Sequence, residues 1–314
     1  MLEEVSIVEL TSRHRRAASP NRTMPRHELT YPKDAHNTVK RYNSNAIHSI
    51  VNESPLVHVS FLPEGSPFPA VLPMIGQMGS FDRPSADIGD VLDLYLHGYV
   101  SSRLVNLSRN SGDPAKGEKE GDEEGEKAGE EGEKAGEKAG EKKKEPGLPV
   151  TVCASLVDGL VLALSPNAHS YNYRSAVLFG YATVVTDVAE KLYAMEIITN
   201  GVVPDRWSKT RVPPNAAEMQ STSVLRVRIV NGSAKIRTGS THDDRCDLDD
   251  DSVLDSVWAG VIPLYPALGT PIPATYNRVK AVPDYLEQYR ADFNTSGHEA
   301  SIEAAAEPPA NAKE

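Results

Sequence analysis

The chain has 314 residues and a formal net charge of −11 at pH 7. This acidic balance argues against nonspecific binding to nucleic acid and against adhesion to an anionic membrane, because both surfaces are negatively charged. The sequence has no run of about 18 apolar residues, so no transmembrane helix is expected.

The start of the chain and its cysteines indicate the compartment. The first residues, MLEEVSIVEL, lack the basic start and apolar centre of a signal peptide, and their two Glu argue against a mitochondrial presequence. Cys153 and Cys246 are too few for a disulfide framework and too far apart for a compact metal motif. We therefore expect a soluble, cytoplasmic protein.

Polar and apolar patterning divides the chain into four parts. Residues 1–36 are polar, with three prolines spread through them, and predict a disordered or strap-like arm. Residues 37–268 form the expected globular domain. Within it, residues 112–146 repeat Gly, Glu, Lys and Ala with no larger apolar side chain, which predicts a disordered insert. Residues 269–314 are rich in Pro and Ala and predict a largely disordered extension.

The first half of the domain predicts one helix, three strands and a second helix. Apolar residues recur at helical spacing over 37–52. Strands are expected over 56–62 and 68–74, joined by a turn that is rich in Pro and Gly, and over 91–97. A helix over about 100–108 follows.

The second half contains two dipeptides that favour tight hairpin turns. Asp158-Gly159 separates apolar segments 150–156 and 160–164, and Asn231-Gly232 separates 223–230 and 234–238. The remaining predicted elements are a strand over 176–185, a helix over 189–200 capped by Asp187, a short helix over 252–259 and a helix over 285–293. Many short strands with few helices indicate a mainly β (α+β) antiparallel barrel rather than a parallel α/β sheet.

Two apolar segments are bordered by polar side chains. The first, LYLHGYVSSRLVNL, contains Ser101, Ser102 and Arg103, and the second, HSYNYRSAVLFGYATVV, contains Tyr173, Arg174 and Ser175. A cation and several hydroxyls at a strand end suit an anionic, planar ligand. We therefore predict one site built from both segments.

One acidic segment has part of the spacing of a calcium loop. In HDDRCDLDDD the residues Asp247, Asp249 and Asp251 alternate as in the start of such a loop, but the required Gly is absent and position twelve is Trp258. A solvated acidic loop is the better interpretation, and no metal site is predicted.

Four segments together resemble the FMN-binding split β-barrel family related to pyridoxamine 5′-phosphate oxidase. The closer similarity is to its flavin-nucleotide-binding branch, which includes nitroimidazole-resistance proteins. The segments are NAIHSIVNESPLVHVSF, LYLHGYVSSR, DGLVLALSPNAHSYNYRSAVLFGYATVV, and SAKIRTG with the downstream WAGVIPL. The resemblance spans about residues 37–266. It implies a six-stranded antiparallel split barrel that forms a homodimer, with FMN in a groove shared by two subunits.

The resemblance also implies residue roles. Ser101, Ser102 and Arg103 resemble the element that holds the FMN phosphate at the start of a helix, where unpaired N–H groups and the helix dipole favour an anion. Leu96 and His97 fall where the family packs the flavin edge or ribityl chain. The strand along the isoalloxazine ring contains Val71, Leu72, Pro73 and Met74, and the second polar contact contains Tyr173, Arg174 and Ser175.

One departure from the family limits the implied function. Pyridoxamine phosphate oxidases carry a C-terminal Arg-x-His element, and none follows Trp258 here, so pyridoxal phosphate synthesis is not expected. The first hypothesis is an FMN-dependent oxidoreductase that passes electrons from reduced flavin to a small acceptor, with no catalytic side chain assigned. The second is a non-catalytic module that binds a flavin nucleotide, or haem through His97.

Overall fold

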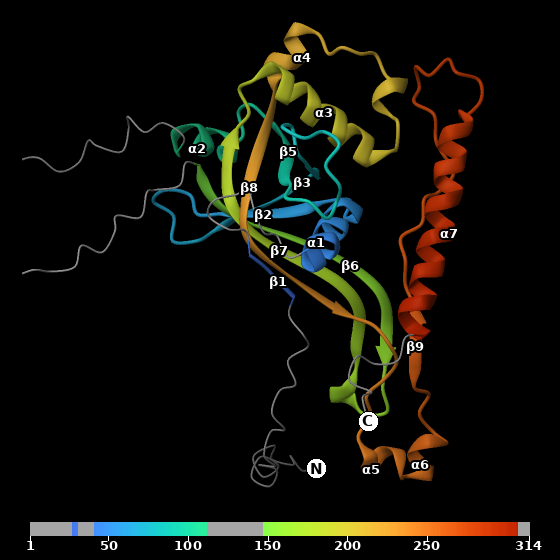
Figure 1. Ribbon diagram of the computed structural model, residues 1–314. Coiled ribbons are helices and arrows are strands. Elements are labelled where there is room, and N and C mark those ends of the chain that lie inside the picture. The colour runs from blue at the N-terminus through green and yellow to red at the C-terminus, as the bar shows by residue number, and fades with distance from the viewer. Residues whose placement is uncertain (1–26, 31–40, 112–146, 307–314) are drawn as a thin grey trace, which may run out of the picture.

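The computed structural model describes residues 27–30, 41–111 and 147–306 (Figure 1). Its centre is one antiparallel sheet with the path β3-β2-β6-β7-β8-β5-β4, to which β1 adds beside β8 and β9 beside β6. The predicted insert and most of the predicted N-terminal arm lie outside the described residues. The strands are β1 (His27–Thr30), β2 (Val57–Phe61), β3 (Ala70–Met74), β4 (Gly76–Gly79), β5 (Asp93–Tyr99), β6 (Leu148–Leu162), β7 (Ser170–Val184), β8 (Thr222–Arg237) and β9 (Gly260–Pro263).

The sheet curls back on itself at Ile75. The two ends of the strand path, β3 and β4, are consecutive in the chain and are separated by this one residue. The backbone N–H of His97 in β5 donates to the Ile75 carbonyl at 3.1 Å, which holds β3 against β5. The predicted antiparallel fold with flanking helices is therefore confirmed. The structure has β1, β4 and β9 in addition to the six strands that the family resemblance implies.

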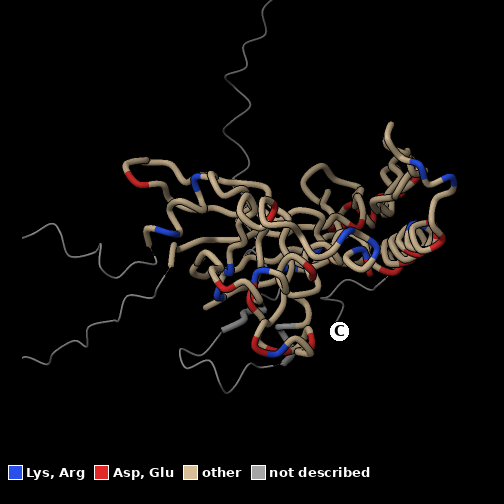
Figure 2. The backbone as a smooth tube through the Cα atoms, turned by 90° about the horizontal axis from the view of Figure 1, so that it is seen from above, with Lys and Arg blue, Asp and Glu red and all other residues tan. Residues whose placement is uncertain are grey.

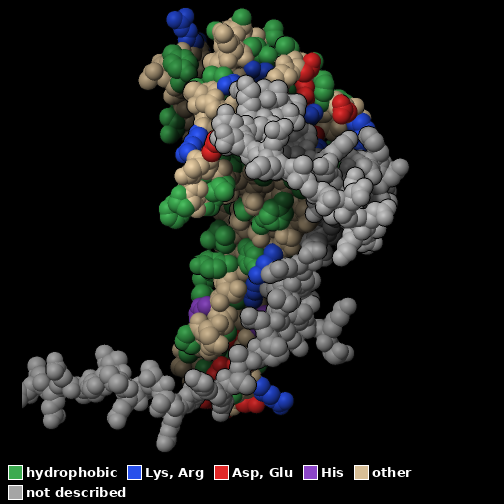
Figure 3. Space-filling model, turned by 90° about the vertical axis from the view of Figure 1, so that its left-hand side faces the viewer, with side chains coloured by type: hydrophobic (Ala, Val, Ile, Leu, Met, Phe, Trp, Pro, Cys, Tyr) green, Lys and Arg blue, Asp and Glu red, His purple; other side chains and the backbone are tan. Residues whose placement is uncertain are grey.

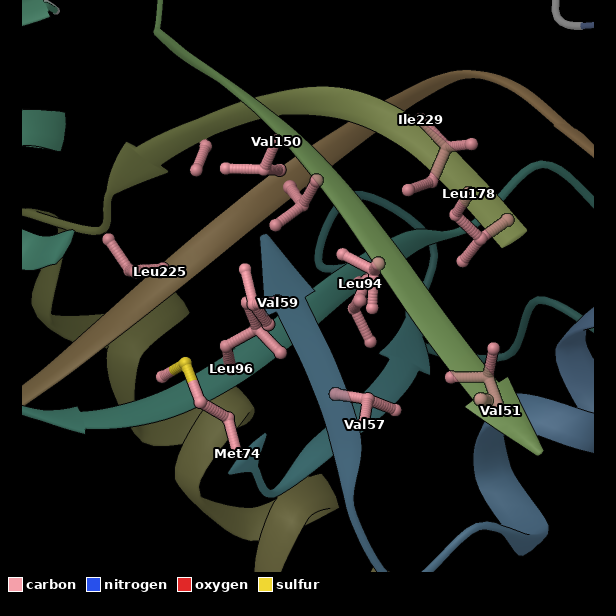
Figure 4. Close-up of a cluster of buried hydrophobic side chains, with 14 of the residues drawn as sticks. Val51, Val57, Val59, Met74, Leu94, Leu96, Val150, Leu178, Leu225 and Ile229 are labelled. Carbon is pink, nitrogen blue, oxygen red and sulfur yellow. The ribbon is translucent and has the colours of Figure 1, made fainter. Parts of the chain in front are cut away.

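Alternation along the strands directs apolar side chains into the barrel. In β5, Leu94 and Leu96 are fully buried inside the barrel. Tyr95 points to the other face of the sheet, where it is buried in a second apolar cluster with residues of α3. Figure 4 shows Val57, Val59 and Leu225 of other strands converging on the same interior. Burying an aliphatic side chain of this size contributes roughly 1.5–3 kcal/mol, so this cluster is a main source of stability.

Several helices pack against strands of the sheet. The helices are α1 (Arg41–Glu53), α2 (Arg103–Ser111), α3 (Val188–Val202), α4 (Ala216–Ser221), α5 (Arg245–Leu248), α6 (Asp251–Leu254) and α7 (Asp284–Ala306), with 3-10 turns at Pro166–Ala168 and Trp207–Lys209. The predicted Asp187 cap is confirmed, since its carboxylate accepts from the Glu190 N–H at 2.7 Å. Among the described residues, no helix is long and apolar enough to cross a membrane. Acidic and basic residues are interspersed along the chain (Figure 2).

Both predicted hairpins are wrong, because β6 and β8 run straight through the two turn dipeptides. At Asp158-Gly159 the pairing of β6 with β7 shifts register, which marks a bulge rather than a turn. At Asn231-Gly232, β8 is paired on both sides, with Phe179 and Leu178 of β7 and with β1. Ladder bonds on both edges outweigh the local turn preference of these dipeptides.

The C-terminal helix is longer than the sequence indicates. The helix expected over 285–293 becomes α7, which continues to Ala306 and packs on β6 and β9. Its last turn is fixed by the fully buried Asn172, whose amide donates to the carbonyls of Ala304 at 3.2 Å and Gly239 at 3.1 Å. This long-range anchor supplies the packing that a weakly amphipathic helix needs.

Candidate functional site

The first predicted group of site residues comes together where β3, β5 and α2 meet. A Cβ placed on Gly98 would lie 3.4 Å from the Met74 side chain and 3.8 Å from the Val105 side chain of α2. The end of β5 and the start of α2 are therefore close to the end of β3. This junction contains Met74, Leu96, His97, Ser101, Ser102 and Arg103.

The start of α2 has the features of an anion site. Ser102 is the cap, because its hydroxyl accepts from the Val105 N–H at 3.3 Å. Arg103 is exposed and forms no hydrogen bond or ion pair with any residue that the structure describes. Unpaired N–H groups in the first turn, the positive end of the helix dipole and a free guanidinium all favour a phosphate.

The remaining residues of this group differ in accessibility. Leu96 is fully buried and Met74 is nearly so, hence both side chains belong to the core. Val71 and Pro73 are exposed on β3, which is an edge strand paired with β2, as expected for a strand that contains Pro. Partial burial lowers the pKa of His97, so its imidazole is neutral at pH 7.

Three large apolar side chains on or next to β3 and β5 are exposed. Phe68, Val71 and Tyr99 are 75%, 55% and 76% exposed. Figure 3 shows green side chains at the surface of the face that carries α2. Large apolar side chains that gather at a surface mark sites for a ligand or a partner chain.

The second predicted group has partners within its own chain. The Arg174 guanidinium donates to the Asp158 carboxylate from Nε and Nη2, each at 3.0 Å, and also pairs with Glu53 of α1. These bonds raise the pKa of Arg174 further above its usual range. Ser175 donates to the Lys235 carbonyl at 3.1 Å, and the Lys235 ammonium lies 5.7 Å from the centre of the Tyr173 ring. These contacts hold β7 to its neighbours.

One chain does not bring the two groups together. Leu96 pairs with Leu225 of β8, which pairs with Val184 near the end of β7. Ser175 lies nine residues earlier in β7 on this route. On the other route Pro73 pairs with His58, His58 with Cys153 and Cys153 with Val177, so β3 lies about three strand spacings, roughly 14 Å, from the part of β7 that carries Ser175. The two groups are therefore separate in one chain, without a hydrogen bond or ion pair between them among the described residues.

Sequence reasoning missed the partners of Arg174. Asp158 was assigned to a turn, although its carboxylate is buried at a bulge and its side chain is only 10% exposed. Glu53 is 121 residues away from Arg174 in the chain. No local pattern connects these three residues.

Sequence reasoning also missed a cavity of about 530 Å³ between α1, β4, α3 and the loop that joins β4 to β5. None of the predicted flavin residues lines it. Its walls are Asn52, Gln77, Met78, Gly79, Ser80, Pro84, Ala86, Ile88, Leu92, Tyr193, Glu196, Ile197, Asn200 and Gly201.

Part of the chain matches a known protein family. Residues 130–236, which include β6, β7 and α3, match the sequence profile of the family described as Pyridoxamine 5′-phosphate oxidase. The predicted family resemblance is confirmed. No curated protein matches the chain significantly.

Solved structures share this pyridoxamine 5′-phosphate oxidase-like fold. The flavocytochrome Anf3 from Azotobacter vinelandii is 24% identical, with a TM-score of 0.56 over 83% of this chain and 99% of that one. The FAD and heme binding protein from Mycobacterium smegmatis is 23% identical, with a TM-score of 0.54 over 77% of this chain and 92% of that one. These two similarities establish the fold.

Proposed function

We propose that this protein binds FMN and passes electrons from the reduced flavin to a small acceptor such as a nitroaromatic, a quinone or oxygen. The observation that carries the proposal is the start of α2, close to the ends of β3 and β5, where Arg103 is exposed and has no hydrogen bond or ion pair with any described residue. The fold supports it, because the two similar structures above are named as a flavocytochrome and as a FAD and heme binding protein.

The groups that are accessible near α2 and β3 would each contact a different part of the flavin. Arg103, the Ser101 hydroxyl and the first N–H groups of α2 would hold the phosphate, and Ser102 would keep that helix end in place through its cap. The exposed backbone of Val71, Leu72, Pro73 and Met74 would line the ring, with His97 and the Leu96 backbone at its edge. The flavin supplies the redox chemistry, and the chain binds and orients it.

The proposal includes a cytoplasmic homodimer. Tyr173, Arg174 and Ser175 lie on β7, apart from the α2 junction of their own chain, and in this homodimer they would reach the flavin from a second copy. The exposed Phe68 and Tyr99 would be covered by that copy. The two cysteines are free, and Cys246 is exposed, which suits a reducing compartment.

A haem-binding module is the second candidate. The exposed and neutral imidazole of His97 favours it, because neutral imidazole is the form that ligates metals.

The visible spectrum of the purified protein separates these functions. Flavin bands that bleach with NAD(P)H and recover with an acceptor support the oxidoreductase. Bound flavin that no donor reduces indicates a carrier, and a Soret band indicates haem. A colourless protein that does not bind added FMN contradicts the proposal.

Arg103→Ala tests the phosphate site directly. Loss of a charged hydrogen bond should weaken FMN binding by about 1.5–3 kcal/mol in an FMN titration. Arg245→Ala is the matched control, since Arg245 is 92% exposed and lies on α5, outside the proposed site. Equal FMN affinity in the two variants would refute the phosphate assignment.

A further inference from the structure

The cavity beside α3 has the size of a small-molecule site. Its volume of about 530 Å³ falls within the range of roughly 300–1,000 Å³ that is usual for ligand pockets. The loop between β4 and β5 lies between α1 and α3 and forms one wall (Figure 1). The cavity shares no residue with the proposed flavin site, and the inference drawn from it does not depend on that proposal.

Three side chains of the wall accept hydrogen bonds from backbone N–H groups. Met78 N–H donates to Asn52 Oδ1 at 2.9 Å, Ser80 N–H to the Tyr193 hydroxyl oxygen at 2.9 Å, and Trp207 N–H to Asn200 Oδ1 at 2.8 Å. A backbone N–H always donates, so the bonded atom of each amide must be its oxygen. The orientation of both Asn side chains is thereby fixed.

The same bonds leave three donors for a ligand. The Asn52 and Asn200 NH₂ groups and the Tyr193 O–H hydrogen have no acceptor among the described residues. The three side chains are half-buried, so water can bind these donors, and a ligand that displaces this water must supply acceptors in its place. The three donors therefore suit a ligand with carbonyl-type oxygens.

Two glycines lie close to side chains of the wall. A Cβ on Gly79 would lie 2.7 Å from both the Tyr193 hydroxyl and the Ile197 side chain, and a Cβ on Gly201 would collide with the Gln77 amide. A larger residue at either position would have to displace the end of one of these side chains, so the two glycines permit the close approach seen here.

A carboxylate and an apolar surface complete the cavity. Tyr193, Glu196 and Asn200 follow one another at helical spacing on α3, so Glu196 lies on the face that lines the cavity. Glu196 is exposed at the rim and has no ion-pair partner in the part of the chain that the structure describes. Apolar contact comes from Met78, Ile88, Leu92 and Ile197.

We propose that this cavity binds a small, flat, uncharged molecule with a carboxamide or cyclic amide group. The ligand carbonyl accepts from Asn200 and from one of the other two donors, Asn52 or Tyr193, its N–H donates to Glu196, and its ring packs on the apolar side chains. An anion would meet the Glu196 carboxylate, whereas a cation would face three donors without an acceptor for them. A neutral amide satisfies both kinds of group.

Benzamide and benzoate test this proposal because they have the same ring and nearly the same shape. In calorimetric titration of the full chain, benzamide should bind saturably, and benzoate about tenfold more weakly. Asn200→Asp keeps the acceptor for Trp207 N–H but removes the free donor, and it should weaken benzamide about tenfold. Glu196→Gln should remove most of the preference for benzamide, since a Gln amide can donate to a carboxylate.

Glu299→Gln on α7 is the matched control, because Glu299 is exposed and remote from the cavity. It should leave both affinities unchanged. The proposal is overturned if benzamide does not bind, if benzoate binds as tightly, or if Asn200→Asp and Glu196→Gln behave like the control. Titrations with and without FMN should agree, and displacement of FMN by benzamide would contradict a separate site.

Discussion

Four ionisable side chains form a network beneath α3, on the outer surface of the barrel. The Tyr95 hydroxyl donates to Glu190 at 3.0 Å, and Arg226 donates to the same carboxylate at 3.1 Å. Asp93 lies 4.0 Å from the Arg226 guanidinium. Burial raises the pKa of Asp93 to about 6, and the opposing effect of Arg226 is too small to restore its usual value of 3.8.

This pKa predicts a pH-dependent contribution to stability. Between about pH 4 and 6 the native state binds more protons at Asp93 than the unfolded state, so the free energy of unfolding falls as pH rises. Asp93→Asn stays neutral and removes this cost. The Asp93 side chain is 30% exposed, so a gain of roughly 1–2 kcal/mol over wild type is expected above pH 6.

Urea unfolding at pH 4, 5, 6 and 7 measures that gain. The difference in unfolding free energy between Asp93→Asn and wild type should grow from pH 4 to pH 6 and then level off. Asp255→Asn, an exposed carboxylate on the same chain, should show no such trend. A difference for Asp93→Asn that is constant with pH would contradict the raised pKa.

Arg174 compensates the buried Asp158, and this can be separated from any contact with a ligand. Arg174→Met leaves the Asp158 carboxylate without its guanidinium and should lower the unfolding free energy by about 2–4 kcal/mol. Adding Asp158→Asn removes the unpaired charge and should restore part of this loss. If the effects of Arg174→Met and Asp158→Asn on the unfolding free energy simply add in flavin-free protein, Arg174 does not compensate the charge of Asp158.

At the scale of helices and strands, local patterns predicted the type of an element better than its length. The helix of α1, the strands β2 and β3 and the Asp187 cap follow from periodicity and capping chemistry, which act within a few residues. The continuity of β6 and β8 depends on pairing with β7 over long sequence distances. Short β4, with sequence GQMG, has no β-branched residue to reveal it.

In the candidate site, too, the sequence revealed local features but not contacts between residues far apart in the chain. The Ser101-Ser102-Arg103 segment could be identified because a helix start and its cap are local features. The assignment of Arg174 to a ligand could not be judged from the sequence, because its partner Glu53 is 121 residues away. Polar side chains beside an apolar strand do not reveal whether a ligand or a distant part of the chain binds them.

Gly180 shows how tightly β7 and β8 approach at their register shift. The pairing shifts between Phe179 and Gly180, and a Cβ on Gly180 would collide with the Arg228 carbonyl and lie 2.9 Å from the Val227 side chain. Gly180→Ala should therefore cost about 1–3 kcal/mol in thermal or urea unfolding. Gly269→Ala is the control, since a Cβ there meets nothing within 4 Å. Similar stability of the two variants would show that the strands separate without cost.

At the scale of the whole molecule, the proposed homodimer determines how the two polar groups would complete a flavin site. In a twofold-symmetric dimer each subunit gives the same surface to its partner, so two equivalent sites form. Each would combine the α2 junction of one chain with Tyr173, Arg174 and Ser175 of the other. This arrangement predicts that impaired subunits can complement one another.

Arg103→Ala and Tyr173→Ala provide the complementation test, since each removes a different half of the proposed site. Co-expression with two different tags allows the mixed dimer to be purified. If the halves come from different subunits, one site of the mixed dimer carries both changes and the other carries neither, so about half of the sites should bind FMN with wild-type affinity. Each homodimer should lack such sites. If each chain instead holds a complete site, every site in the mixed dimer carries one change, and no wild-type affinity returns.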